Sequence, residues 1–176
     1  MPGFLNADEA DLWFRKIENS LPWRSESLSM YGRRIRVPRE VAWCGDSDLN
    51  YRYSGLDHQA SGWSPEMRAL KIRVEQACAS RFNFVLANRY RDGRDYMGWH
   101  RDNEPGMASL VASLSLGDSR RFLFRTSQQK RSHRLLLDHG SLLIFDGAMR
   151  HSLPRCAAAA SRINLTFRNL AGNDGS

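Results

Sequence analysis

The sequence predicts a mainly β fold with flanking helices, of the antiparallel sandwich or jelly-roll kind. Six short segments after residue 81 alternate apolar and polar side chains, and no helical pattern separates them. Turn residues such as Asp92-Gly93 and Asp146-Gly147 lie between these segments. Short strands in direct succession favour an antiparallel sandwich over an alternating α/β fold. The length of 176 residues suits one compact domain with a sizeable core.

Two helices are predicted in the N-terminal part of the chain. Asn6 opens a capping-box pattern, and apolar residues recur behind it at helical spacing until Pro22. A second helix is predicted from Ser64 as N-cap, with Pro65 at its first position. Between the two helices, residues 24–62 have strand and loop character. We expect both helices to brace one sheet.

The alternating segments are the predicted strands of the β fold. They cover residues 82–90, 108–116, 120–126, 133–137, 141–146 and 161–168. In an extended strand every second residue faces the same side, so each strand can present one face to a core.

Composition excludes several classes of protein. The apolar runs are only a few residues long, far short of a membrane span, and no basic and then apolar leader opens the chain. The cysteines Cys44, Cys78 and Cys156 are odd in number and have no C-x-x-C spacing, which argues against a zinc knuckle or a disulfide scaffold. We therefore expect a cytoplasmic protein without membrane contact.

The charge indicates an anionic partner. The chain has 26 basic and 19 acidic residues, a net charge of +7, and nearly all of its basic residues are arginine. A guanidinium can bind two oxygens of one phosphate or carboxylate at once, so nucleic acid is the leading candidate for this partner. A preference for Arg over Lys can also reflect genome composition alone.

Three residues have the pattern of a metal site. His100 and Asp102 are two apart, which places both side chains on one face of an extended segment. His151 follows a predicted strand and could complete a set of two histidines and one carboxylate if the sheets fold back on each other. Such a set occupies one face of Fe(II) and leaves the other positions open, as non-haem oxygenases require. Taken alone, an H-x-D pair is not specific.

The last predicted strand has two contrasting faces. Its apolar face consists of Ile163, Leu165 and Phe167. Its polar face consists of Arg162, Asn164, Thr166 and Arg168. This polar face could be solvated, as is common in antiparallel sheets, or it could point inward and hold a dicarboxylate. Asn88 and Tyr90, at the end of the first predicted strand, could then supply further hydrogen bonds.

Together these motifs resemble the AlkB family of Fe(II)/2-oxoglutarate-dependent dioxygenases, which demethylate nucleic acids. The matching parts are residues 88–102, His151, the Arg162-x5-Arg168 strand and the segment from Pro38 to Gly55. The resemblance runs from about Val37 to Leu170. The Pro38 to Gly55 segment is similar to the branch that contains the mammalian DNA-repair homologues.

The resemblance implies a double-stranded β-helix with iron held by His100, Asp102 and His151. It also implies that Arg162 pairs with the far carboxylate of 2-oxoglutarate. The rest of that pocket would be Asn88, Tyr90, Asn164, Thr166 and Arg168. In the family, oxidative decarboxylation of 2-oxoglutarate by O2 leads to hydroxylation of an N-methyl group, which is released as formaldehyde. The implied substrates are 1-methyladenine and 3-methylcytosine in DNA, and RNA as well.

The resemblance also implies contacts to the nucleic acid. Tyr53, with His100 opposite, matches the pair that stacks on the extruded base, and Tyr51 would line the same pocket. The family often has a second acidic residue after the iron-binding Asp, where this chain has Asn103 followed by Glu104. Without the resemblance, the two tyrosines would be interpreted as ordinary cross-strand packing.

A basic hairpin would contact the duplex around the lesion. Met30 and Tyr31 align with the apolar finger that duplex-acting relatives insert into the base stack. The arginines expected near phosphates are Arg33, Arg34, Arg36 and Arg39. A solvated basic hairpin is the alternative.

We therefore predict a single dioxygenase domain, acting as a monomer. Residues 1–81 would form the N-terminal helices and nucleotide-recognition region, residues 82–170 the jelly-roll core, and residues 171–176 a tail. Two alternatives remain. One is a 2-oxoglutarate oxygenase that acts on a protein or a small molecule. The other is a metal-binding jelly roll that binds nucleic acid without turnover.

Overall fold

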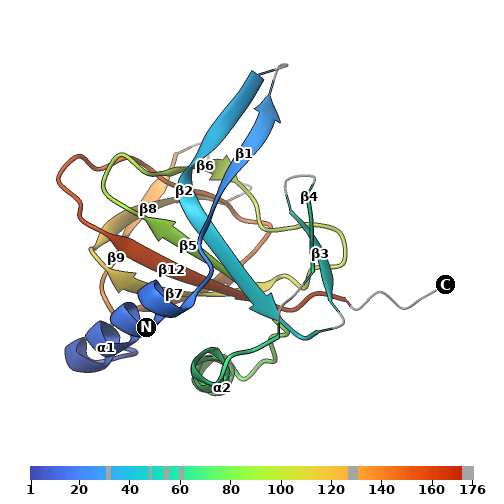
Figure 1. Ribbon diagram of the computed structural model, residues 1–176. Coiled ribbons are helices and arrows are strands. Elements are labelled where there is room, and N and C mark those ends of the chain that lie inside the picture. Colours follow the sequence, from blue (N-terminus) through green and yellow to red (C-terminus); the bar gives the residue numbers. More distant parts are fainter. Residues whose placement is uncertain (31–32, 48, 54–55, 60–61, 127–130, 172–176) are drawn as a thin grey trace.

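The computed structural model describes residues 1–30, 33–47, 49–53, 56–59, 62–126 and 131–171, and Figure 1 shows their arrangement. Its helices are α1 (Ala7–Ser20) and α2 (Pro65–Cys78). Its strands in the N-terminal part are β1 (Arg24–Met30), β2 (Arg33–Gly45), β3 (Asn50–Tyr53) and β4 (Leu56–Gln59). The others are β5 (Phe84–Tyr90), β6 (Met97–His100), β7 (Leu110–Gly117), β8 (Arg120–Arg125), β9 (His133–Leu137), β10 (Leu142–Asp146), β11 (Arg150–Leu153) and β12 (Arg162–Arg168).

The strands form two principal antiparallel sheets. The larger sheet has the order β1-β2-β5-β12-β7-β10, and the smaller has the order β6-β11-β8-β9. Strands β3 and β4 form a separate hairpin. Apart from the consecutive pairs β1-β2 and β8-β9, neighbouring strands in the two sheets are not consecutive in the chain, which is the topology of a jelly roll. The predicted fold class is confirmed.

Both helices begin where the sequence predicts. The side chain of Asn6 accepts a hydrogen bond from the Glu9 amide at 2.9 Å, and that of Ser64 accepts one from the Met67 amide at 3.2 Å. The helices lie against one face of the larger sheet (Figure 1). Their buried residues, such as Ile17 and Leu70, pack in one core with apolar residues of β5, β7 and β12.

All six predicted strands are present, with ends that differ by up to two residues. Two strands of the smaller sheet, β6 and β11, were not predicted as strands. Each has only four residues, and their pairing contains a register shift between His151 and Leu153. A short strand with an irregular register has too few residues to establish an alternating pattern.

The register of the sheets brings the polar residues of different strands together. Across the β5–β12 pair, Tyr90 lies opposite Arg162 and Asn88 lies opposite Asn164. In the smaller sheet, His151 lies opposite His100. The inner faces of the two sheets therefore place a histidine pair across from a polar strand face.

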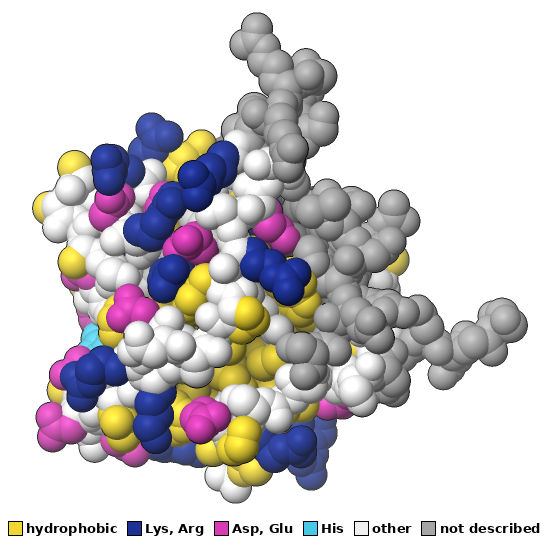
Figure 2. Space-filling model, in the orientation of Figure 1, with side chains coloured by type: hydrophobic (Ala, Val, Ile, Leu, Met, Phe, Trp, Pro, Cys, Tyr) yellow, Lys and Arg dark blue, Asp and Glu magenta, His cyan; other side chains and the backbone are white. Residues whose placement is uncertain are grey.

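The outer surface has mixed charge. On the face shown in Figure 2, Lys and Arg side chains are interspersed with Asp and Glu. Within the described residues, neither helix is long and apolar enough to cross a membrane.

Candidate metal centre and adjoining pocket

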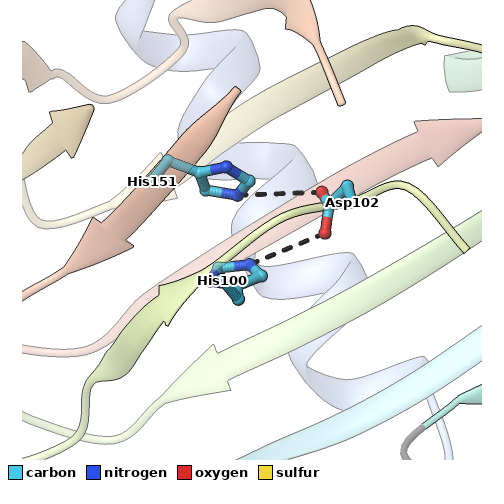
Figure 3. Close-up of side chains that lie close together, drawn as sticks. All are labelled: His100, Asp102 and His151. Atoms are coloured by element: carbon cyan, nitrogen blue, oxygen red, sulfur yellow. Dashed lines mark ion pairs between the residues drawn. The ribbon is translucent and has the colours of Figure 1, made fainter. Parts of the chain in front are cut away.

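His100, Asp102 and His151 converge at one point between the sheets (Figure 3). Nε2 of His100 lies 3.6 Å from Oδ1 of Asp102, and Nε2 of His151 lies 3.8 Å from Oδ2. The potential ligand atoms all lie within 4.8 Å of one another. The spacing suits three ligands on one side of a single ion. The predicted convergence of these three side chains is therefore observed.

The backbone fixes which nitrogen of each imidazole can bind a metal. Nδ1 of His100 lies 2.9 Å from the carbonyl oxygen of Gly98, and Nδ1 of His151 lies 2.8 Å from that of Met149. A carbonyl oxygen only accepts, so each Nδ1 carries the proton and donates it. Each Nε2 then presents its lone pair toward Asp102, which is the tautomer that a metal ligand needs.

The electrostatics of the cluster favour neutral imidazole. Burial, and then the neighbouring His151 ring, lower the pKa of His100 to about 4, and the carboxylate of Asp102 opposes this shift. Oδ1 of Asp102 accepts no hydrogen bond from the described residues, although Nη2 of Arg168 lies 2.9 Å away. A buried carboxylate oxygen that accepts no hydrogen bond, with the Nε2 atoms of two imidazoles beside it, fits a divalent cation.

Two phenylalanines hold the ring of His151. Phe122 is stacked on it with a centroid distance of 5.2 Å, and Phe145 meets it edge-on at 5.0 Å. No pattern in the sequence marks either phenylalanine as a site residue, because each occupies an ordinary apolar position of a predicted strand. Their contact with the histidine depends on how β8, β10 and β11 are placed, which no local pattern reveals.

Gly147 allows the loop of Asp102 to pass close to the β10–β11 turn. The amide of Asp102 donates to the carbonyl oxygen of Gly147 at 2.8 Å, and the amide of Gly147 donates to Ser109 at 2.6 Å. A Cβ at position 147 would overlap the carbonyl oxygen of Asp102. Only glycine therefore permits this approach.

We expect Gly147→Ala to lower stability by about 1–3 kcal/mol, because the two backbone hydrogen bonds prevent the overlap from relaxing. The added methyl group should also push the backbone of Asp102 away from its position beside the two histidines, and this should weaken Mn(II) binding. Thermal unfolding and a Mn(II) titration measure the two effects. Gly98→Ala is the matched control, since a Cβ there meets no atom within 4 Å. Equal behaviour of the two variants would contradict the tight approach.

A partly open cavity adjoins the three residues. Its wall combines residues of both sheets. The lining residues include Asn88, Tyr90, Ser113, Leu137, Arg162, Asn164, Thr166 and Arg168. All six residues predicted to bind a cosubstrate therefore lie in one wall next to the metal centre.

The polar face of β12 points into this cavity. Arg162 and Arg168 are 1% and 3% exposed, which is incompatible with a solvated outer face. The alternate residues Ile163, Leu165 and Phe167 are fully buried in the core on the opposite side of the sheet. Of the two orientations left open by the sequence, the inward one is observed, and binding of a dicarboxylate by this face stays a prediction.

Arg162 is a buried cation surrounded by neutral acceptors. Its Nη2 donates to the hydroxyl of Ser115 at 2.7 Å, and its Nη1 donates to the carbonyl oxygens of Asp118 and Leu137, both at 3.3 Å. Its Nε has no hydrogen-bond partner, and no carboxylate of the described residues lies within ion-pair distance. Burial lowers the pKa of Arg162 to about 10, which still leaves it charged at neutral pH. Such a group fits an anionic ligand.

The remaining polar residues of the wall form two groups of hydrogen bonds. Thr166 Oγ1 donates to Asn164 Oδ1 at 2.8 Å, and Asn164 Nδ2 donates to Ser113 Oγ at 2.7 Å. Nε of Arg39 donates to Asn88 Oδ1 at 2.8 Å. These bonds fix the orientation of both amides.

Arg39 differs from its sequence-based expectation. It is only 5% exposed, and its guanidinium lies behind Asn88. Arg39 is therefore a buried residue that supports Asn88 from behind, and it does not lie on an exposed surface that could contact phosphates. The sequence predicts a surface position for Arg39 because neighbouring residues are basic. In the structure, β2 continues beyond the hairpin and pairs with β5 in the larger sheet.

The other predicted substrate contacts are only partly described. Arg36 is exposed, and its Nη2 donates to Ser25 Oγ at 2.6 Å. Asn103 is exposed and Glu104 half-buried, in the loop after Asp102. Tyr31 lies outside the described residues. The backbone is described but the side chain is not for Met30, Arg33, Arg34, Tyr51 and Tyr53.

Comparison with known proteins identifies the family. The sequence profile described as the 2OG-Fe(II) oxygenase superfamily matches residues 1–168. The chain belongs to this superfamily. DNA oxidative demethylase ALKBH2 of Mus musculus is 40% identical to this oxygenase over 180 residues, which cover 92% of this chain and 75% of that protein. The human protein named alpha-ketoglutarate-dependent dioxygenase alkB homolog 3 is 33% identical, with coverage of 96% and 64%.

These similarities place the oxygenase in the AlkB family. The fold agrees with that of a 2OG-Fe(II) oxygenase family oxidoreductase from Burkholderia pseudomallei, with a TM-score of 0.64, 15% identity, and coverage of 98% of this chain and 85% of that one. Members of the superfamily use Fe(II) and 2-oxoglutarate, and the donor set and the buried guanidiniums of this oxygenase fit both.

Proposed function

We propose that this oxygenase removes N-methyl groups from nucleic-acid bases, with 1-methyladenine and 3-methylcytosine in DNA as its substrates and RNA as a further substrate. The observation that carries the proposal is the His100, Asp102 and His151 cluster beside the buried Arg162, in a chain up to 40% identical to proteins named DNA oxidative demethylases. The chain spans 64% to 75% of the two relatives described above.

In the proposed site, His100, Asp102 and His151 hold Fe(II). Bound Fe(II) with 2-oxoglutarate and O2 supplies the oxidising chemistry. Arg162 binds the far carboxylate of 2-oxoglutarate. Arg168, whose Nη2 lies 2.9 Å from Oδ1 of Asp102, would balance the charge of that carboxylate and contribute to the cosubstrate pocket. The remaining contacts come from Asn88, Tyr90, Asn164 and Thr166.

The proposed substrate requires an extruded base. A methyl group on the pairing edge of a base cannot reach the metal from inside a duplex, so the nucleotide must be flipped out or presented on a single strand. We assign Tyr51 and Tyr53 to the pocket of that base. Asn103 and Glu104 would meet its edge, and an amide at position 103 can donate as well as accept.

A basic surface beside the metal centre supports a nucleic-acid substrate. Arg101 follows His100, and Arg150 and Arg125 lie opposite each other on β11 and β8. The guanidiniums of Arg125 and Arg150 lie 4.4 and 5.9 Å from the ring centroid of Trp99. All three arginines line one surface pocket, in which Asp146 is the sole acidic lining residue. A guanidinium stacked on an indole keeps its edge free for phosphate oxygens.

We expect the variant with Arg125→Gln and Arg150→Gln to bind a methylated oligonucleotide about tenfold more weakly, because two phosphate contacts are lost. The slope of log affinity against log salt should fall by about two. Fluorescence anisotropy at several salt concentrations measures both. Arg15→Gln, an exposed site on α1, is the control. An unchanged slope would show that this surface does not face the nucleic-acid backbone.

The decisive test of the function is a single-turnover reaction. The protein is incubated without oxygen with Fe(II), 2-oxoglutarate and an oligonucleotide that contains 1-methyladenine or 3-methylcytosine, and oxygen is then admitted. We expect succinate and formaldehyde in equal amounts. Succinate that does not depend on the methylated base would favour an oxygenase with a protein or small-molecule substrate. Oligonucleotide binding with neither product would favour a non-catalytic binding module.

We further propose a cytoplasmic monomer with a single dioxygenase domain. Cys44, Cys78 and Cys156 are all unpaired, which suits a reducing compartment. Sedimentation of the purified protein tests the oligomeric state.

A further inference from the structure

Arg120 is a further buried guanidinium near the pocket, and no motif in the sequence singles it out. Arg120 and Arg162 are the two largest fully buried side chains of the described residues, each 1% exposed. Arg120 begins β8 and lies opposite Leu137 of β9, and Arg162 donates to the carbonyl oxygen of that same Leu137. The two cations therefore occupy neighbouring parts of the interior. Of the two, only Arg162 lines the cavity.

Arg120 is held by backbone carbonyls and not by an acid. Its Nη2 donates to the carbonyl oxygens of Asp95 and Pro154, at 2.9 and 2.6 Å. Its Nε and Nη1 have no hydrogen-bond partner, and within the described part of the chain no carboxylate forms an ion pair with it. Burying a cation without an anion is unfavourable, so two such cations side by side indicate a region built to receive a negative charge.

Tyr90 connects Arg120 to the cavity. The guanidinium of Arg120 lies 5.8 Å from the ring centroid of Tyr90. Tyr90 lines the cavity and lies directly opposite Arg162 across the β5–β12 pair. Tyr90 therefore has Arg162 opposite it on the neighbouring strand and the guanidinium of Arg120 over its ring. Burial is the main cause of the lowered pKa of Arg162, and the charge of Arg120 adds to it, so the two cations interact.

We propose that Arg120 is a positioning residue that makes this end of the pocket selective for an oxo acid with a second carboxylate at its far end. It acts through two routes. Its guanidinium holds the ring of Tyr90, and its charge adds to that of Arg162 at the place where the far carboxylate of 2-oxoglutarate binds. The proposal rests on the assignment of Arg162 to that carboxylate and is independent of the nucleic-acid substrate.

The test compares two ligands that differ only in the far group. 2-Oxoglutarate carries a carboxylate there, and 2-oxopentanoate carries a methyl group. Both are titrated calorimetrically into the protein loaded with Mn(II), so that binding is measured without turnover. Arg120→Gln removes the charge but keeps an amide that can donate to a backbone carbonyl. Arg120→Lys keeps the charge. Arg121→Gln, the exposed neighbour on β8, is the matched control.

We expect Arg120→Gln to weaken 2-oxoglutarate binding on the order of tenfold and to leave 2-oxopentanoate binding nearly unchanged, because only 2-oxoglutarate presents a charge at the far end. Arg120→Lys should retain most of the preference, and Arg121→Gln all of it. Equal losses for both ligands, or no loss, would overturn the proposal. If Arg120→Gln does not fold, Arg120→Lys decides, since loss of the preference in that charged variant would overturn the electrostatic role.

The experiment also separates this proposal from the others. A wild-type protein that binds both ligands equally would contradict the role of Arg162 itself. A preserved preference for 2-oxoglutarate in Arg120→Gln, with formaldehyde still released from methylated DNA, would reject the role of Arg120 and leave the proposed function intact.

Discussion

Asp102→Ala should abolish 2-oxoglutarate turnover, with a loss of roughly three orders of magnitude or more, because it removes the sole carboxylate of the proposed ligand set. The structure predicts a second consequence. Arg168 is 3% exposed, and its Nη2 lies 2.9 Å from Asp102. Without that carboxylate, a buried cation loses its counter-charge, which typically costs about 3–5 kcal/mol.

Two variants separate these effects. Asp102→Asn keeps the volume of the side chain but removes the charge, so it should lose Mn(II) binding and turnover much as the alanine variant does. The double variant with Asp102→Ala and Arg168→Met also removes the guanidinium that faces Asp102. We expect it to recover much of the lost thermal stability but none of the activity. Turnover near the wild-type level in either single variant would contradict the metal assignment.

The parts of the fold that the sequence could predict are those with local causes. Asn6 and Ser64 cap helices through bonds to residues three positions away, so short patterns are sufficient. The two faces of β12 follow from strict alternation within seven residues. His100 and Asp102 were recognisable because two ligands come from one short segment.

The parts that the sequence could not predict depend on contacts between distant segments. Arg120 looks like any basic residue at the start of a strand. Its burial results from two carbonyls, 25 and 34 residues away in the chain. Arg39 belongs to a basic segment, and only the pairing of β2 with β5 places it behind Asn88. A charged residue in a sequence is normally expected to lie on the surface of the protein. Buried arginines such as these two can be recognised only when the pairing of the strands is known.

Arg162→Met should change the stability of the free protein little and weaken the cosubstrate complex strongly. In the free protein Arg162 is a buried cation whose pKa is lowered from 12.5 to about 10, and the shift corresponds to a cost on the order of 3 kcal/mol for keeping it charged. Its three hydrogen bonds offset this by about 0.5–1.5 kcal/mol each. The two contributions nearly cancel, so replacing Arg162 with a residue of similar volume should change the melting temperature of the free protein only slightly.

The complex with 2-oxoglutarate should be affected strongly, because the anion then loses its charge-assisted partner in a buried site. We expect the dissociation constant of 2-oxoglutarate to rise about a hundredfold. The increase in melting temperature that 2-oxoglutarate produces in the wild type should then be lost at the same concentration, since ligand stabilisation depends on the ratio of concentration to dissociation constant. Oligonucleotide affinity should stay within about twofold, because Arg162 is remote from the surface that we assign to phosphates. Parallel losses of cosubstrate and oligonucleotide binding would instead indicate a general disruption of the β12 strand and would reject a specific carboxylate clamp.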